Sequence, residues 1–166
     1  MKLLVVSDIH GSPLGAKRLK RIYEQERPDQ ILLLGDILDH GEGSEVVSFF
    51  RLHAYHTSAV KGNCDSVYDE KALMLSLPEH RAYDYLGHTL HLQHILSWAV
   101  SYPPGDMVLF GHTHVKTLYR EKGVTYLNPG SLSYPRDETA SYALITPEGV
   151  YLKDADSDKT IIFLES

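Results

Sequence analysis

The sequence predicts an α/β protein with two packed sheets and helices on the outside. Three short apolar runs in the first half are typical of strands buried on both faces, and each leads into a polar, glycine-containing loop and then a helical segment. This repeated order favours right-handed crossovers and a parallel sheet. The second half contains apolar segments joined by short turns, which predict hairpins. Because no linker, internal repeat or low-complexity segment divides residues 1–166, we expect one domain.

The first half alternates strands with helices. On the first helix, Leu19, Ile22 and Tyr23 share one side, and a glycine-rich loop ending at Ser44 opens the second helix. We expect strands at residues 3–6, 31–34 and 57–60, and helices at residues 16–25, 45–53 and 67–76.

The second half consists mainly of strands. Leu86-Gly87 and Glu121-Lys122-Gly123 each join two neighbouring apolar runs, so each pair is predicted to form a hairpin. We expect strands at residues 80–85, 88–93, 107–110, 115–120, 124–127, 142–145, 150–153 and 160–164.

Composition indicates an ordinary globular chain. It is 43% apolar and 23% charged, and no run approaches the roughly 18 apolar residues of a membrane span, so we expect no membrane partner. The formal charge of -6 argues against a nucleic-acid partner, and the basic run at residues 17–21 is expected to form a solvated helix face. A single cysteine, Cys64, excludes an internal disulfide framework and favours a cytoplasmic location.

Asp36 occupies the most informative position. It follows the apolar run at residues 31–34 and Gly35, just past the carboxyl end of a predicted central strand. Open α/β sheets place their ligand sites at this edge. A short acid there suits a bridge between two metal ions, whereas a lone Gly-Asp pair favours a cap for the next helix. The other polar residues decide between these interpretations.

Six further polar side chains fall at or just beyond strand ends. Asp8 and His10 are two residues apart, as are His112 and His114, so in an extended segment each pair points the same way and can converge on one point. His91 competes with His94, but its parity directs it to the opposite face of the sheet. Together with Asp36, the predicted ligand set comprises Asp8, His10, Asn63, His94, His112 and His114.

This set has the donor chemistry of a hydrolytic metal centre. Its oxygen and imidazole donors, without a thiolate, favour Mn, Fe, Zn or a similar ion over a structural zinc site. Two carboxylates against two divalent cations leave a charge of about +2, which would attract a phosphate to an acidic protein.

These motifs resemble those of the calcineurin-like metallophosphoesterases, and more closely the YfcE-type phosphodiesterases, relatives of the retromer subunit Vps29. The resemblance covers essentially the whole chain and implies a four-layer α/β/β/α sandwich with a two-metal site. It rests on Asp8-x-His10, Gly35-Asp36-x-x-Asp39, Gly62-Asn63-Cys64-Asp65, His94, Gly111-His112-x-His114 and Asn128-Pro129-Gly130-Ser131.

The resemblance also implies ligands and a mechanism. Asp36 would bridge two divalent ions, with Mn expected and Fe, Zn, Ni, Co or Mg as alternatives. A metal-bridging hydroxide would attack the phosphorus in line. One ion would be held by Asp8, His10, His114 and Asp36, and the other by Asp36, Asn63, His94 and His112.

Two positions depart from the family pattern. Many relatives have a proton-donating histidine after the ligand asparagine, oriented by an acid at the position of Asp39, but here that residue is Cys64. A thiol is a poor match for this task, so the sequence favours phosphodiesters over monoesters. Asp39, His40 or Asp65 would then assist proton transfer, or Cys64 is simply a small buried hydrophobe. Leu96 stands where relatives have a second histidine, which removes a donor from the substrate side.

We therefore expect a small-molecule phosphodiesterase, with catalysis assigned to Asp36, Asn63, Asp39 and Cys64. The alternatives are a non-catalytic Vps29-like interaction scaffold and a phosphomonoesterase. A nuclease is disfavoured, because no basic track accompanies the core. Residues 97–106 are expected to form a rim or lid of the pocket, and exposed tyrosines are expected to mark a homo-oligomer interface.

Overall fold

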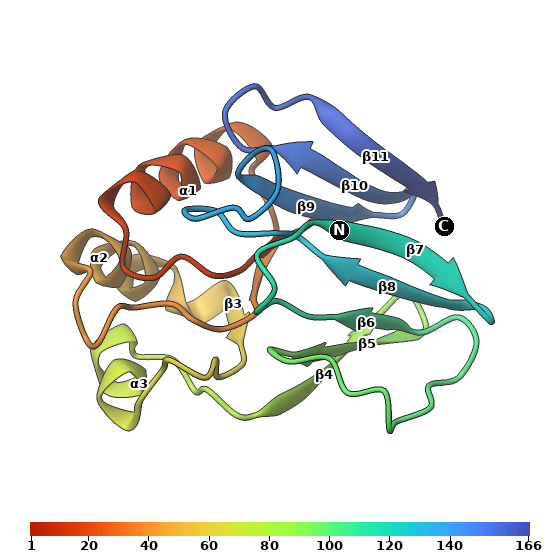
Figure 1. Ribbon diagram of the computed structural model, residues 1–166, viewed down its shortest axis with the longest axis horizontal. Coiled ribbons are helices and arrows are strands. Elements are labelled where there is room, and N and C mark those ends of the chain that lie inside the picture. Colours follow the sequence, from red (N-terminus) through yellow and green to blue (C-terminus); the bar gives the residue numbers. More distant parts are fainter.

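A computed structural model describes residues 1–166 and contains two mixed β-sheets packed face to face (Figure 1). The first half alternates strands and helices, as its sequence predicts. Its elements are β1 (Leu3–Val6), α1 (Pro13–Glu26), β2 (Gln30–Leu33), α2 (Ser44–His53), the 3-10 turn η1 (Ala54–His56), β3 (Thr57–Ala59) and α3 (Val67–Leu73).

The second half contains only strands and connecting loops, again as predicted. The strands are β4 (His80–Tyr85), β5 (His88–Gln93), β6 (Met107–Leu109), β7 (Thr117–Glu121), β8 (Val124–Asn128), β9 (Ser141–Thr146), β10 (Gly149–Asp154) and β11 (Thr160–Glu165). None of the three α-helices combines the length and the apolar character that crossing a membrane requires.

The two sheets mix parallel and antiparallel pairs. The first has the order β11-β10-β9-β1-β2-β3, and β1, β2 and β3 run parallel as expected from their helical crossovers. The second has the order β4-β5-β6-β8-β7, in which the predicted hairpins β4/β5 and β7/β8 are antiparallel.

Side chains of β1 point alternately to the two faces of the first sheet, so this strand packs against both the helices and the second sheet. Leu4 and Val6 pack toward the helices, whereas Leu3 and Val5 pack between the two sheets. All three helices contribute to the core on the outer face of the first sheet, and Figure 1 shows them side by side there. Both faces of β1 are thus buried, as its continuous apolar sequence indicates. The predicted sandwich of two mixed sheets flanked by helices is confirmed.

Two helix boundaries differ by three residues from the sequence-based expectation. Helix α1 begins at Pro13 because the Ser12 hydroxyl caps it by accepting the Gly15 N–H at 3.1 Å. The helix expected over residues 67–76 ends at Leu73, because Met74 adopts a left-handed backbone conformation with φ of 58°. The chain then leaves the helix and buries two further leucines in the helical core.

The carboxyl ends of the central strands of both sheets meet at one edge of the sandwich. After β1 and β2, the Asp8 N–H donates to the Gly35 carbonyl at 3.1 Å. After β5 and β6, the Gly111 N–H donates to the His94 carbonyl at 2.9 Å. This edge carries the predicted ligand set.

Candidate metal centre

The loops after the strands place the seven predicted ligand side chains close together. Asp8 and His10 follow β1, Asp36 follows β2, and the rest lie on the loops after β3, β5 and β6. The backbone N–H groups of Ile9 and His10 both donate to the Asp36 carbonyl at 3.0 Å. Backbone hydrogen bonds therefore hold the loop after β1 against the loop after β2.

The ligand pairs converge for a different reason from the one predicted. Asp8, His10, Asp36, His112 and His114 have φ of 54°, 50°, 51°, 67° and 58°, so they are left-handed rather than extended. Asp and His tolerate this region better than most residues, yet it still costs free energy. The alternation argument for Asp8/His10 and His112/His114 is therefore wrong, and successive tight turns bring each pair together.

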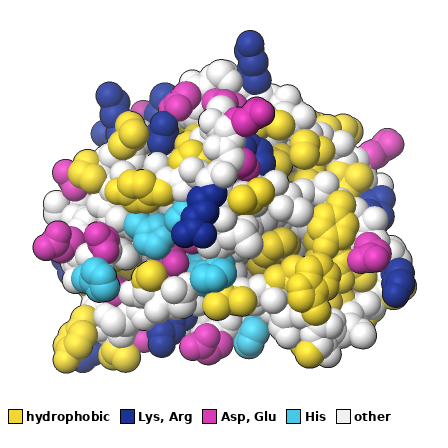
Figure 2. Space-filling view, in the orientation of Figure 1, with side chains coloured by type: hydrophobic (Ala, Val, Ile, Leu, Met, Phe, Trp, Pro, Cys, Tyr) yellow, Lys and Arg dark blue, Asp and Glu magenta, His cyan; other side chains and the backbone are white.

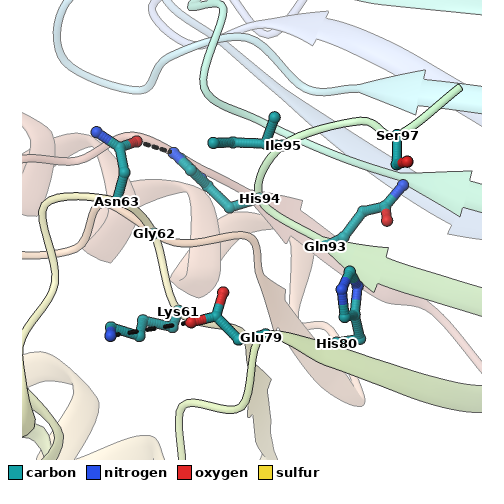
Figure 3. Close-up of a pocket in the computed structure, with 9 residues that line it drawn as sticks. All are labelled: Lys61, Gly62, Asn63, Glu79, His80, Gln93, His94, Ile95 and Ser97. Carbon is teal, nitrogen blue, oxygen red and sulfur yellow. Dashed lines mark hydrogen bonds and ion pairs between the residues drawn. The ribbon is translucent and has the colours of Figure 1, made fainter. Parts of the chain in front are cut away.

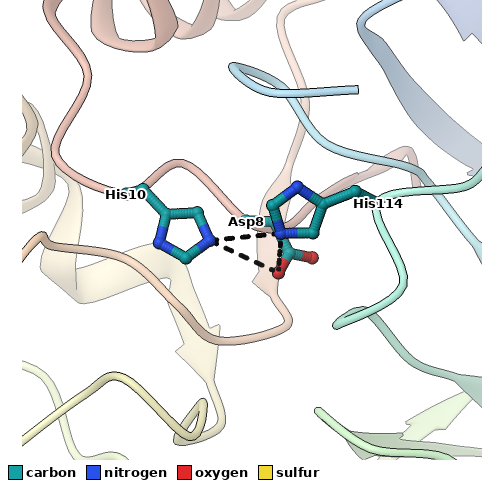
Figure 4. Close-up of side chains that lie close together, drawn as sticks. All are labelled: Asp8, His10 and His114. Carbon is teal, nitrogen blue, oxygen red and sulfur yellow. Dashed lines mark hydrogen bonds and ion pairs between the residues drawn. The ribbon is translucent and has the colours of Figure 1, made fainter. Parts of the chain in front are cut away.

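Asp8, His10 and His114 form the first group (Figure 4). The His114 Nε2 lies 3.3 Å from Asp8 Oδ1 and 3.2 Å from the His10 Nε2, and Figure 4 shows both imidazoles directed toward the carboxylate. The His10 Nε2 lies 3.9 Å from Asp8 Oδ1. The ring nitrogens and the carboxylate oxygen thus surround a common point.

Asp36, His94 and His112 form the second group, and Asn63 lies among them. The Asn63 Oδ1 lies 3.0 Å from the His94 Nε2 and 2.9 Å from the His112 Nδ1. The His94 and His112 rings are 5.3 Å apart at their centroids. Asn63 and His112 are exposed, so this group opens to solvent.

Asp36 lies between the two groups. Its Oδ2 is 3.6 Å from the His10 Nε2 and 3.2 Å from the His94 Nε2, and its Oδ1 accepts the Cys64 N–H at 2.8 Å. Burial raises the pKa of Asp36, but the hydrogen bonds from His94 and Cys64 outweigh it and lower the pKa to about 2. The carboxylate is therefore ionised at neutral pH.

Backbone carbonyls orient two of the imidazoles. The Nδ1 of His94 lies 2.6 Å from the Leu34 carbonyl oxygen, and the Nδ1 of His114 lies 2.7 Å from that of Tyr134. A carbonyl only accepts, so each Nδ1 carries the proton and each Nε2 is left free to bind a ligand. Burial lowers the pKa of His94, but Asp36 more than compensates and the pKa is raised. Asp8 likewise raises the pKa of His114.

These side chains fit a divalent cation. Asp8 is fully buried, yet its Oδ1 has no hydrogen-bond partner, although three imidazole nitrogens lie within 4.0 Å of it. A buried carboxylate oxygen without a partner is costly, and a metal ion would remove that cost. Carboxylate, amide and imidazole donors suit Mn, Fe and Zn.

Asp65 holds the loops around Asp36, which sequence reasoning missed. Its carboxylate accepts the backbone N–H groups of Asp36, Ile37 and Gly62, each at 2.8 Å. A Cβ on Gly62 would lie 2.1 Å from Asp36 Oδ1, so only glycine allows this approach. Asp65 was expected as a proton-transfer group, but both of its oxygens are occupied by backbone donors. An acid two residues after Gly-Asn is the signal that could have indicated this turn.

The loop at residues 128–131 supports the other side of the centre. The Asn128 amide donates to the Gly111 carbonyl at 2.9 Å, and the Ser131 hydroxyl donates to the Asp8 carbonyl at 2.7 Å. Both residues are fully buried. They fix the backbone beside Asp8 and His112 without facing the ligand positions.

The remaining site predictions have different surroundings. The Asp39 side chain is 65% exposed and lies outside the three potential metal-binding groups, and its Oδ1 is 3.7 Å from the His40 Nε2. Cys64 is exposed rather than a buried hydrophobe, and its thiol forms the third group with His10 and Asp36. His91 lies away from the centre, bound to Asp106 at 2.8 Å.

Comparisons with known proteins agree with this geometry. The calcineurin-like phosphoesterase superfamily domain matches residues 1–149. The chain belongs to this superfamily. The family indicated by its sequence motifs is thereby confirmed. Membership in this superfamily implies that the chain binds divalent metal ions.

Curated relatives lie among bacterial members of the superfamily. The chain is 29% identical over 164 residues to phosphodiesterase YfcE of Escherichia coli K12. The aligned segment covers 87% of each protein. It is also 29% identical to the probable metallophosphoesterase YsnB of Bacillus subtilis, over 89% of this chain and 85% of the relative. These relatives support a hydrolase.

Solved structures show the same fold. The E. coli YfcE phosphoesterase superposes with a TM-score of 0.92 at 27% identity and 99% coverage of both chains. The zinc complex of Vps29 from Entamoeba histolytica gives a TM-score of 0.71 at 20% identity and 99% coverage of both chains. At that identity, the second likeness shows the fold alone.

Proposed function

We propose that the chain hydrolyses small-molecule phosphodiesters with two divalent metal ions. The observation that carries this proposal is the position of Asp36, because a single carboxylate oxygen faces His10 at 3.6 Å and His94 at 3.2 Å. A carboxylate between two groups of imidazoles suits a bridge between two cations.

Each group would hold one ion. When bound, the two ions activate a water molecule for attack on phosphorus and neutralise charge on the phosphoryl oxygens. Asp8, His10 and His114 would hold one ion, Asn63, His94 and His112 would hold the other, and Asp36 would contribute to both. Their donor chemistry suits Mn²⁺, Fe²⁺ and Zn²⁺, and Mn²⁺ is the working ion of this proposal.

The chain's own residues orient this chemistry. The carbonyls of Leu34 and Tyr134 keep two imidazoles in the metal-binding tautomer. Asp8 is fully buried whereas Asn63 and His112 are exposed, so the phosphate approaches from the side of the exposed pair. Imidazoles held in place in this way need little rearrangement as charge develops on the phosphoryl group.

Cys64 supports diesters over monoesters. Partial desolvation raises the pKa of its exposed thiol, and the neighbouring Asp36 carboxylate raises it further. A thiol that holds its proton this tightly is a weak acid for a poor leaving group. The proposed substrates are therefore phosphodiesters with good leaving groups.

Hydrolysis of bis(p-nitrophenyl) phosphate, with p-nitrophenyl phosphate as the monoester comparison, tests the proposal. With Mn²⁺, the wild type should release p-nitrophenolate faster from the diester, and Asp36→Ala should abolish the activity. Exposed Asp84 is a control, because Asp84→Asn removes a carboxylate outside the centre. If the wild type is inert with every divalent ion and indistinguishable from Asp36→Ala, the proposed hydrolase function is refuted. The non-catalytic interaction scaffold would then be the remaining alternative.

A further inference from the structure

A polar pocket of about 460 Å³ adjoins the metal centre on the side of His94 (Figure 3). Lys61 and Glu79 form one wall and lie 3.9 Å apart, while Gln93 and Ser97 contribute an amide and a hydroxyl. Ile95 is its one apolar lining residue. The pocket therefore offers both donors and acceptors, which is the combination that recognises hydroxyl groups.

The Gln93 amide lacks a partner in this pocket. Gln93 is 2% exposed, and its Nε2 makes no hydrogen bond. Figure 3 shows the amide between His80 and Ser97. A buried amide donor without a partner is unfavourable. A ligand oxygen in the pocket would satisfy it.

An apolar groove of about 320 Å³ adjoins the same centre on the side of His112. Leu96, Trp98, Phe110 and Tyr119 supply its apolar surface. Tyr126 extends it, because its ring stacks on Tyr119 at 5.0 Å and on Trp98 at 6.1 Å. Figure 2 shows hydrophobic side chains gathered over the five-stranded sheet beside the histidines.

The metal centre lies between the pocket and the groove. His94 and Asn63 line the polar pocket, whereas His112 lines the groove. Ile95 lines both and separates them. A phosphorus held at this centre would therefore direct one ester arm into each space.

We propose that the substrate is an unsymmetrical phosphodiester, with a hydroxylated alcohol in the polar pocket and an aromatic or apolar alcohol in the groove. This inference rests on the proposed phosphodiesterase function and adds the chemical class of each arm. Gln93 and Trp98 are its specificity residues, since each contacts an arm and neither belongs to the ligand set.

Two matched esters test the polar arm: glyceryl p-nitrophenyl phosphate and propyl p-nitrophenyl phosphate, which differ only in two hydroxyl groups. Wild-type kcat/KM should be about tenfold higher for the glyceryl ester. Gln93→Leu should reduce this ratio toward one, because it removes the amide that would contact the hydroxyl groups of the glyceryl ester. Ser97→Ala, at a half-buried position, provides a second and milder variant in case Gln93→Leu does not fold.

The groove is tested by turnover and by binding. Trp98→Ala should raise KM for both esters several-fold and leave their ratio unchanged, whereas Tyr55→Ala, an exposed aromatic on η1, should change neither. Trp98 is the only tryptophan, so quenching of its fluorescence by either nitrophenyl ester reports groove occupancy without turnover.

The outcomes separate this inference from the proposed function. Equal kcat/KM for the two esters, with bis(p-nitrophenyl) phosphate still hydrolysed, would overturn the polar arm and keep the phosphodiesterase. Absence of tryptophan quenching at ester concentrations that saturate turnover would overturn the groove. Inactivity toward all three esters would overturn both proposals.

Discussion

The carboxylate of Asp65 accepts the backbone N–H of Asp36 at 2.8 Å, so one acid positions another. The same carboxylate accepts two more backbone N–H groups from the loops after β2 and β3. Asp65 is 5% exposed, which places this contact inside the protein. Its arrangement makes Asp65 a positioning residue for the shared ligand.

Asp65→Asn should weaken metal binding more than folding. An amide offers one acceptor oxygen instead of two and turns a donor toward a backbone N–H, so at least one buried donor loses its partner. We expect metal affinity to fall about 10–100-fold, as is common for residues that orient ligands. Isothermal titration with Mn²⁺ measures the affinity, and thermal unfolding of the metal-free protein separates it from a general loss of stability.

Asp36→Asn and His10→Ala should remove different numbers of ions. Asp36 faces both groups, so its neutralisation should impair both sites, whereas His10 faces only the first group and Asp36. Metal content after dialysis should fall toward zero for Asp36→Asn and toward one ion per chain for His10→Ala. Equal loss in both variants would contradict a bridging role for Asp36.

Cys64→His should raise monoester hydrolysis relative to diester hydrolysis. The thiol lies beside Asp36 and next to the ligand Asn63, where an imidazole could protonate a leaving group. We expect the ratio of the two kcat/KM values to shift about tenfold toward the monoester, a modest part of what a positioned acid supplies. Cys64→Ser is the matched control, and an unchanged ratio in Cys64→His would refute this explanation.

Glu26 should make the free energy of unfolding depend on pH in the acidic range. The Tyr142 hydroxyl donates to its Oε1 at 2.9 Å, and Lys153 also contacts it. Burial raises the pKa of Glu26, but the hydrogen bonds from Lys153 and Tyr142 outweigh it, so the pKa lies below its usual 4.5. The ionised group therefore stabilises the fold above about pH 4.5, and this contribution disappears as pH falls through the lower, folded-state pKa.

Glu26→Gln should accordingly lower the free energy of unfolding by about 2 kcal/mol at pH 7. The difference from wild type should narrow as the pH falls below 4.5. Urea unfolding at several pH values measures it. A constant difference across that range would show that the ionised carboxylate is not the source.

The sequence predicts much of the fold because its signals are local. The apolar runs of β1 and β2 and the Leu86-Gly87 turn each act within a few residues, and each predicted element is present. The end of α3 was missed, since Met74 leaves the helix so that Leu75 and Leu77 can reach the core. That preference depends on tertiary packing and has no local signature.

The sequence predicts those parts of the candidate site in which the residue type itself indicates metal binding. Histidines and acids at strand ends indicated the ligand set. The role of Asp65 depends instead on backbone N–H groups from two loops that only the fold brings together. The catalytic role of Asp39 rests on its motif position alone and stays a prediction, because its side chain is 65% exposed and lies outside the three potential metal-binding groups.

The left-handed ligand positions also constrain how this chain can evolve. Each holds a side chain in a conformation where glycine would be more relaxed, by about 1 kcal/mol or more. A lineage released from selection for metal binding would relieve this strain by accepting glycine at any of the five, Asp8, His10, Asp36, His112 or His114. The gain would be largest at exposed His112, because glycine at Asp8 or Asp36 would also remove the acceptor of a backbone hydrogen bond. This chain has accepted none of those substitutions. Such drift would erase the centre one position at a time while leaving the sandwich intact, and its first steps would be favoured by folding itself.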